Sequence, residues 1–318
     1  MSYQLDPELV PVMRTLAAQA AGLPPIRRGD WKALRERGNA GQAALAALVP
    51  PVTGVHATNY TATTTDGAAI GLRWYTAATD GRRPGPAVLY AHGGGMILGS
   101  LDLYDSLLSW YVAQTGVPFL SAGYRLAPEV TGTTLAEDVF AGLLWLREHA
   151  RDLRVDPARI GVMGDSGGGS PAAGTAILAR DRGIHLARQI LAYPMLDDRN
   201  QTADGDARAP YLTWTYDDNY TAWRAVLGDQ LGTGAVSPIA APARLTNFTG
   251  LAPAYIDVGD LDIFRDEAIR YAQNLAKAGV PIELHVYPGV PHGWERIAPG
   301  ATLGARAMAG RTRVISSF

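Results

Sequence analysis

Short apolar runs alternate with amphipathic stretches along most of this chain. The apolar runs predict buried strands, and the stretches between them, with apolar residues three or four positions apart, predict helices. This alternation is typical of a mostly parallel sheet with helices on both faces, an α/β fold. The expected strands are 70–75 (an exposed or edge strand), 87–90, 118–121, 160–163, 190–192, 255–258 and 282–286. The expected helices between them include 106–115, 172–180 and 265–278.

Two segments depart from this alternation. Residues 1–50 predict two helices, one beginning at Asp6-Pro7 and one over 31–48. Residues 199–238 carry a cluster of aromatic side chains, which we expect to form mainly the core of a helical insertion: Tyr211, Trp214, Tyr216, Tyr220 and Trp223. We expect both segments to fold as a cap over the carboxyl edge of the sheet. The sheet domain then consists of residues 51–198 and 239–318.

Composition excludes several classes of site and partner. The net charge is −2 without a block of Lys and Arg, so neither nucleic acid nor an anionic membrane is expected as a partner. The absence of cysteine excludes disulfides, thiolate zinc sites and cysteine nucleophiles. The N-terminus has no basic and apolar signal segment, and no apolar run is long enough to span a membrane. We therefore expect a cytoplasmic protein.

Two glycine-rich turns carry the candidate chemistry. Gly164-Asp165-Ser166-Gly167-Gly168 follows an expected strand and precedes an expected helix, the setting in which Gly-x-Ser-x-Gly exposes a serine nucleophile. His92-Gly93-Gly94-Gly95 fits a turn whose N–H groups, together with that of Gly167, form an oxyanion hole. The sequence does not settle which of Gly93, Gly94 and Gly95 donate. The two turns together predict acyl transfer.

A serine nucleophile needs a base and a carboxylate that orients it. His292 follows the last expected strand, where a loop can carry its imidazole over the sheet edge toward Ser166. The carboxylate is expected between the serine and the histidine in chain order, and both Asp260 and Asp262 follow the strand 255–258. Asp266 is expected to open the next helix. The residues alone leave Asp260 and Asp262 as alternatives, and the chemistry requires no metal or cofactor.

Two other functions fit parts of the sequence. Gly167, Gly169 and Ala172 match a loose dinucleotide-binding fingerprint, but no acidic residue lies near Tyr193 at the end of the next strand. An inactive protein that binds small molecules on the same fold is the second alternative. Loss of one residue among serine, acid and base would indicate it, and all three are present.

Four segments of the chain resemble the hormone-sensitive-lipase-like family of bacterial esterases, an α/β-hydrolase family. They are His92–Gly95, Tyr124–Glu129, Gly164–Gly168, and Asp262–Glu267 with His292-Gly293 beyond it. The resemblance implies a carboxylesterase with a helical cap, a covalent acyl-enzyme and a triad of Ser166, His292 and Asp262, the first Asp of the acid segment. It also implies short- to medium-chain acyl esters as substrates, and a homodimer. The segment Tyr124–Glu129 is expected to brace the oxyanion turn.

Some residues depart from the family pattern. Gly167 stands where alanine is usual, and its N–H keeps the expected role. Pro171 requires the following helix to start late or to kink. Met96 replaces a common aromatic residue, and Trp294 is large, so both are expected to alter the acyl pocket.

Overall fold

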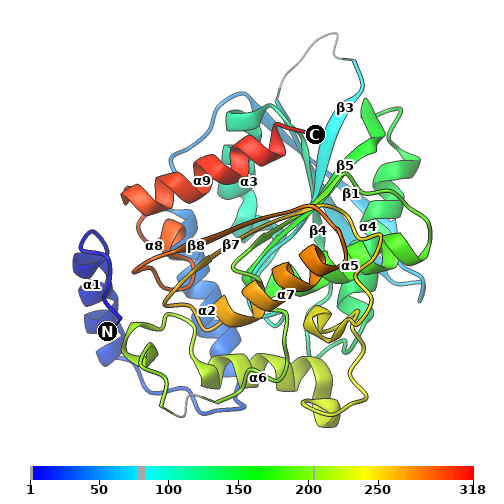
Figure 1. Cartoon of the computed structure of the whole chain (residues 1–318). Helices are drawn as coiled ribbons and strands as arrows, with labels where there is room; N and C mark the ends of the chain where they lie inside the picture. The colour runs from blue at the N-terminus through cyan, green and yellow to red at the C-terminus, as the bar shows by residue number, and fades with distance from the viewer. Residues whose placement is uncertain (1–2, 78–82, 203–204) are drawn as a thin grey trace.

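A computed structural model describes residues 3–77, 83–202 and 205–318, and its centre is one twisted sheet (Figure 1). The strand order is β1-β2-β4-β3-β5-β6-β7-β8. The β1–β2 and β2–β4 pairs are antiparallel and all later pairs are parallel, which confirms the mostly parallel sheet. The strands are β1 Val55–Thr63, β2 Ala69–Ala77, β3 Gly85–Ala91, β4 Phe119–Gly123, β5 Val155–Asp165, β6 Arg188–Ala192, β7 Ala254–Gly259 and β8 Ile282–Tyr287.

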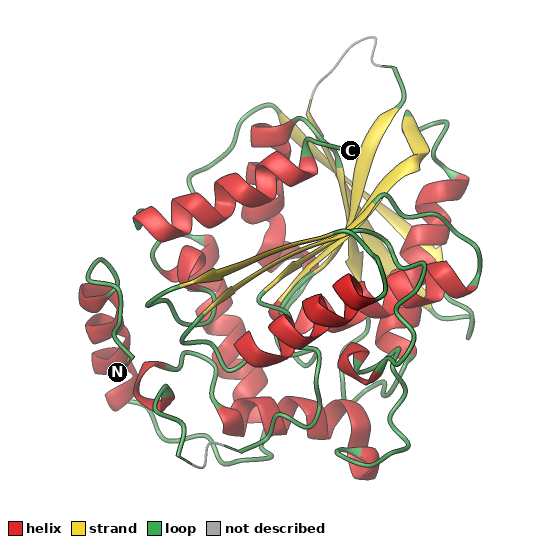
Figure 2. Ribbon diagram, in the orientation of Figure 1, coloured by secondary structure: helices red, strands yellow, loops and turns green. Residues whose placement is uncertain are grey.

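Helices cover both faces of the sheet (Figure 2). The α-helices are α1 Val10–Ala21, α2 Trp31–Ala46, α3 Leu101–Thr115, α4 Thr134–Glu148, α5 Gly169–Asp181, α6 Tyr216–Leu227, α7 Arg265–Lys277, α8 Trp294–Ile297 and α9 Thr302–Ile315. Leu108 of α3 and Val314 of α9 share one buried cluster with Val88 of β3. The apolar faces of α4, α5 and α7 belong to a separate, larger cluster. The α/β architecture follows from burying a strand face beneath each helix layer.

The strand β1 was not predicted, and its composition explains why. Most of its positions are exposed, so the sequence shows no apolar alternation there. It pairs along its whole length with β2. The expected edge strand 70–75 is therefore an interior strand, because β1 lies on one side of it and β4 on the other.

The N-terminal segment contacts the 199–238 insertion. The Arg28 guanidinium donates to Asp217 of α6 at 2.7 Å, and the Gly29 N–H donates to the Thr221 hydroxyl at 2.8 Å. In Figure 1 α1, α2 and α6 lie along the same side of the molecule. The first helix begins at Val10 and not at Asp6, whose N–H donates to the Gly289 carbonyl. In the described part of the chain, no helix has the length and apolarity needed to cross a membrane.

A buried ion cluster attaches the C-terminal helix to the sheet. Arg311 of α9 makes a bidentate pair with Asp257 of β7, with both N–O distances 2.7 Å. Its Nη1 also donates to Glu295 at 2.7 Å. Arg311 and Asp257 are 2% and 0% exposed, so a carboxylate left without the arginine would be a buried, uncompensated charge.

Arg311→Met is expected to lower the free energy of unfolding by about 3–5 kcal/mol, because it leaves two buried carboxylates without their cation. Urea denaturation followed by circular dichroism measures the change. The matched control is Arg313→Met on the same helix. Arg313 is 58% exposed in its pair with Glu283, and its loss is expected to cost under about 1 kcal/mol. Equal effects of the two substitutions would contradict a stabilising role of the cluster.

Candidate active site

Ser166 lies in a strained turn at the end of β5. Its φ is +52°, in the left-handed region that a side chain seldom adopts. A short 3₁₀ turn, Ser166–Gly168, separates the strand from α5. Helix α5 therefore starts late, at Gly169, and Pro171 falls in its first turn, where a missing N–H costs no hydrogen bond. This is the first of the two outcomes expected for that proline.

Ser166, His292 and Asp262 form one hydrogen-bonded chain. The Asp262 Oδ2 lies 2.7 Å from His292 Nδ1, and a carboxylate at that distance fixes the proton on Nδ1. His292 Nε2 then accepts from the Ser166 hydroxyl, with 2.7 Å between the two atoms. The edge contacts that Tyr193 and Phe264 make with the imidazole hold the ring in place. The geometry of this chain fits a hydroxyl, a base and the acid that orients it.

The two candidate aspartates have different surroundings. Asp262 is fully buried, and its second oxygen, Oδ1, accepts from the Phe264 N–H at 2.9 Å. The Asp260 carboxylate instead accepts from the Gly289 N–H at 2.7 Å. Asp266 begins α7 as expected and pairs with its neighbour Arg265. Of the predicted acids, only Asp262 has a hydrogen bond to His292 among the described residues.

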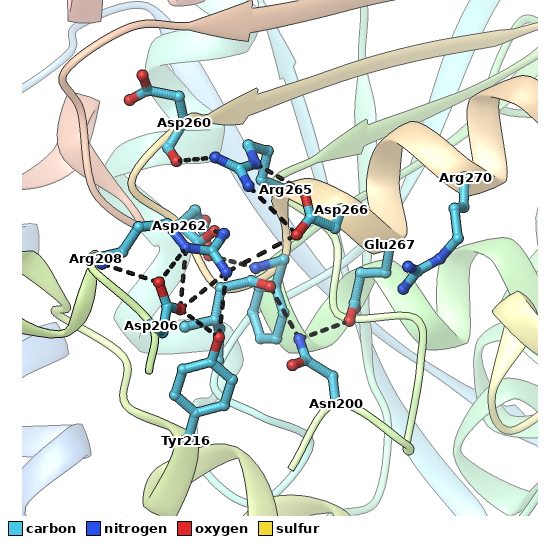
Figure 3. A network of polar contacts seen from close by, with 12 residues as sticks. Asn200, Asp206, Arg208, Tyr216, Asp260, Asp262, Arg265, Asp266, Glu267 and Arg270 are labelled. Carbon is cyan, nitrogen blue, oxygen red and sulfur yellow. Dashed lines mark hydrogen bonds and ion pairs between the residues drawn. The ribbon is translucent and has the colours of Figure 1, made fainter. Parts of the chain in front are cut away.

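The acid loop is tied to the insertion by Arg208, which sequence reasoning missed (Figure 3). Its Nη1 donates to the Asp262 carbonyl at 2.8 Å, and its other nitrogens contact Asp206 and the Tyr216 hydroxyl. Arg208 and its partner Asp206 are both largely buried. Despite burial, the hydrogen bond and charge of Arg208 lower the pKa of Asp206 to about 2.

Asp165 joins the two glycine-rich turns. Its carboxylate accepts from the Gly93 N–H at 3.0 Å, from Tyr90 at 2.5 Å and from Tyr104 at 3.0 Å. Burial, and then the Asp165 charge, raise the pKa of both tyrosines, so they stay protonated as donors. The N–H of Gly93 is therefore directed at Asp165.

The other three glycine N–H groups of the predicted oxyanion hole have different surroundings. Among the hydrogen bonds of the described residues, none engages the N–H of Gly94, Gly95 or Gly167. Gly167 also lies at the start of a helical turn, where N–H groups have no partner within the helix. The two turns thus leave donors beside Ser166 without a protein partner.

The stretch after β4 braces the His92–Gly95 turn. The Tyr124 hydroxyl donates to the His92 carbonyl at 2.6 Å, and the two rings stack with centroids 4.4 Å apart. The Ala127 N–H donates to the Met96 carbonyl. Burial lowers the pKa of His92, so this histidine is a neutral part of the turn.

A cavity of about 640 Å³ opens onto Ser166 and His292. Helices α1 and α2 form one wall, and Trp214 of the insertion lies against the oxyanion turn. Met96 and Trp294 do not line this cavity; both are buried, and Trp294 packs against Tyr193 and Tyr287. The expectation that these two residues shape the acyl pocket is therefore not supported. Their neighbours Leu98 and Arg296 line it instead.

The described residues near the site form neither a metal site nor a complete dinucleotide fingerprint. Glu267 is buried behind the acid loop, where burial raises its pKa although the Leu196 N–H donates to it. Within the described ranges, no group of three or more His, Asp or Glu side chains could hold a metal ion. The dinucleotide fingerprint also lacks its acidic partner, because β6 ends at Ala192 and Tyr193 follows.

Comparison of sequences places the chain among known esterases. A family described as having the alpha/beta hydrolase fold matches residues 88–296. Esterase LipI of Mycobacterium tuberculosis is 37% identical over 246 residues, which cover 74% of this chain and 76% of that protein. Ethyl acetate hydrolase of Pseudomonas putida is 35% identical over 246 residues, which cover 74% of each chain.

Solved structures agree with the sequences. A bacterial heroin esterase is 35% identical with a TM-score of 0.87, and the match covers 98% of this chain and 97% of that one. A hyperthermophilic esterase from the archaeon Pyrobaculum calidifontis is 30% identical with a TM-score of 0.85, covering 99% and 98%. The chain therefore belongs to the hormone-sensitive-lipase-like family of α/β-hydrolases, and it is a carboxylesterase.

Proposed function

We propose that the protein hydrolyses short- to medium-chain acyl esters with Ser166 as nucleophile, His292 as general base and acid, and Asp262 as the orienting carboxylate. The observation that carries this proposal is the hydrogen-bonded chain between these three side chains, at 2.7 Å for each contact. It lies at the floor of a cavity large enough for a small ester.

The proposed reaction has two steps. Ser166 Oγ attacks the ester carbonyl while His292 Nε2 takes its proton, and the tetrahedral intermediate collapses when His292 returns that proton to the leaving alcohol. Water, deprotonated by His292, then attacks the acyl-enzyme and releases the carboxylic acid and the free Ser166 hydroxyl. The Asp262 carboxylate stabilises the imidazolium that forms in each step.

We infer that the N–H groups of Gly94, Gly95 and Gly167 stabilise the oxyanion, whereas that of Gly93 holds Asp165 in place. Support comes from how closely the two turns approach each other. A Cβ built on Gly167 would lie under 3.0 Å from the backbone nitrogens of both Gly95 and Met96. Glycine in place of the usual alanine thus allows the turns to converge on one point, as an oxyanion hole requires.

The substrate class rests on the cavity and on the relatives. One wall of the cavity consists of α1 and α2 and another of residues from the insertion, which supports the proposed cap of 1–50 and 199–238 over the core segments 51–198 and 239–318. A cavity of about 640 Å³ has room for both parts of a short- to medium-chain ester. The name of one relative, ethyl acetate hydrolase, is consistent with a small ester. A cytoplasmic location, a homodimer and the absence of a nucleic-acid partner stay predictions.

Ser166→Ala is expected to reduce hydrolysis of p-nitrophenyl esters by about 10⁶-fold, because no other group can form the acyl-enzyme. The measurement is kcat/KM over a series from acetate to palmitate, with the wild type expected to favour the short chains. Ser106→Ala on α3, away from the cavity, is the matched control and keeps full activity. Substantial hydrolysis by Ser166→Ala would exclude this nucleophile.

Asp262→Asn is expected to lower kcat by roughly 10³- to 10⁴-fold, because the amide no longer favours the productive imidazole tautomer. Asp260→Asn is the matched comparison. Its side-chain oxygen can still accept from the Gly289 N–H, so kcat changes less than about tenfold. If Asp260→Asn showed the larger loss, the assignment of the acid would be reversed.

Gly167→Ala introduces the residue usual in the family, yet kcat is expected to fall at least about tenfold. The added methyl group forces the two turns apart and moves the N–H donors of Gly95 and Gly167 away from the carbonyl oxygen. Gly234→Ala is the control, since a Cβ there would meet nothing within 4 Å. Unchanged kinetics in Gly167→Ala would show that the convergence of the turns does not set the oxyanion geometry.

A further inference from the structure

Arg296 of α8 lies in the wall between two adjoining cavities. One is the 640 Å³ cavity that contains Ser166 and His292. The other, of about 580 Å³, lies between α2, α3 and α9 and is lined mainly by apolar side chains. The cavities share Leu45, Leu48 and Arg296. Among the residues that the structure describes, Arg296 is the only Lys or Arg that lines either cavity.

The guanidinium of Arg296 has few partners for a group that is only 10% exposed. Its Nη1 donates to the Tyr104 hydroxyl at 2.9 Å, and its Cζ lies 4.6 Å from the centre of the Tyr104 ring. A guanidinium has five N–H donors in a planar fork. For the described part of the chain, Nε and Nη2 of Arg296 have no hydrogen-bond partner.

The nearest carboxylate forms an ion pair with this charge but no hydrogen bond. The Oδ2 of Asp165 lies 3.9 Å from Arg296 Nη1, beyond hydrogen-bond distance. Asp165 is already held by Tyr90, Gly93 and Tyr104. Glu295, next along the chain, directs its Oε1 to Arg311 and Tyr193. Although burial opposes it, the surrounding tyrosines and Asp165 raise the pKa of Arg296, so it remains a cation.

We propose that Arg296 binds a carboxylate of the substrate, so that the enzyme prefers esters whose acyl or alcohol part carries an anionic group. The inference rests on the proposed function of Ser166, because it places the reacting ester in the first cavity and the anionic end at its boundary with the second. A planar guanidinium pairs with a carboxylate through two parallel hydrogen bonds. In a cavity with mainly apolar walls such a pair is poorly screened, and it discriminates between substrates by charge.

The test compares esters of matched length and different charge. Monoethyl adipate, ethyl hexanoate and ethyl 6-aminohexanoate share a six-carbon acyl chain and are anionic, neutral and cationic. A second pair, 5-(butanoyloxy)pentanoate and pentyl butanoate, carries the charge difference in the alcohol. The quantity measured is the ratio of kcat/KM for the anionic ester to that for its neutral match, in the wild type, Arg296→Gln and Arg296→Lys.

In at least one pair of esters, Arg296→Gln is expected to lower the anionic-to-neutral ratio of kcat/KM by about 10- to 100-fold. This loss is expected to come from a higher KM for the anionic ester. Arg296→Lys is expected to keep part of the preference for the anionic ester. The cationic ester is a poor substrate for the wild type and for Arg296→Lys, but not for Arg296→Gln. Arg306→Gln, which removes an exposed arginine of α9, leaves the ratio unchanged. The proposal is overturned if neither ratio moves, or if Arg296→Gln slows all esters equally, which would indicate a purely structural role through Tyr104 and Asp165.

Two further measurements cover a variant that does not fold and a failure of the anionic preference. If Arg296→Gln does not fold, competitive inhibition of the wild type by adipate and by 1,6-hexanediol replaces it. Adipate must inhibit at least about tenfold more strongly, and equal inhibition contradicts the proposal. Hydrolysis of ethyl hexanoate that disappears in Ser166→Ala upholds the proposed function even where the anionic preference fails.

Discussion

The proposed active site depends on how closely two backbone turns approach each other at the carboxyl ends of β3 and β5. These strands are adjacent and parallel, with Ala91 paired to Gly164, so the turns that follow them leave the sheet side by side. A side chain in either turn would collide with the other: a Cβ on Gly93 would lie 2.6 Å from an Asp165 oxygen. The glycines make the approach sterically possible, and the Asp165 carboxylate makes it energetically favourable, because the N–H of one turn binds the anion of the other. The strained φ of Ser166 is held within this contact.

The sequence predicted the parts of the fold whose structure depends on residues close together in the chain. The interior strands could be predicted because burial on both sides makes them apolar, and the nucleophile turn because its glycines are adjacent in sequence. β1 could not be found, since a strand with one partner and a mostly exposed surface carries no apolar pattern. The residues alone did not decide between Asp260 and Asp262, because both follow β7 and the course of the loop decides which side chain meets His292. Only the family resemblance favoured Asp262.

Polar contacts between residues far apart in the chain could not be predicted from the sequence either. Arg296 and Tyr104 are 192 positions apart, and Arg208 and Asp262 are 54 apart. No local pattern marks an arginine whose partner is a distant carbonyl or hydroxyl. The contacts of Asp165 were not predicted either, although a buried carboxylate needs hydrogen-bond partners. Its donors come from three separate elements and become evident only in the folded protein.

The hydrogen bond between Arg208 and the Asp262 carbonyl has a consequence for exchanging the segment 199–238 between related enzymes. Residues 199–238 lie partly over the cavity, where Thr213 and Trp214 line it. The same segment supplies Arg208, which holds the loop of Asp262, the proposed triad acid. A chimera that received this segment from a relative would exchange cavity-lining residues and the support of the Asp262 loop in one step. On the proposed function, substrate choice and turnover are thus linked in this chain, and a transplanted segment needs an arginine that reaches the same carbonyl.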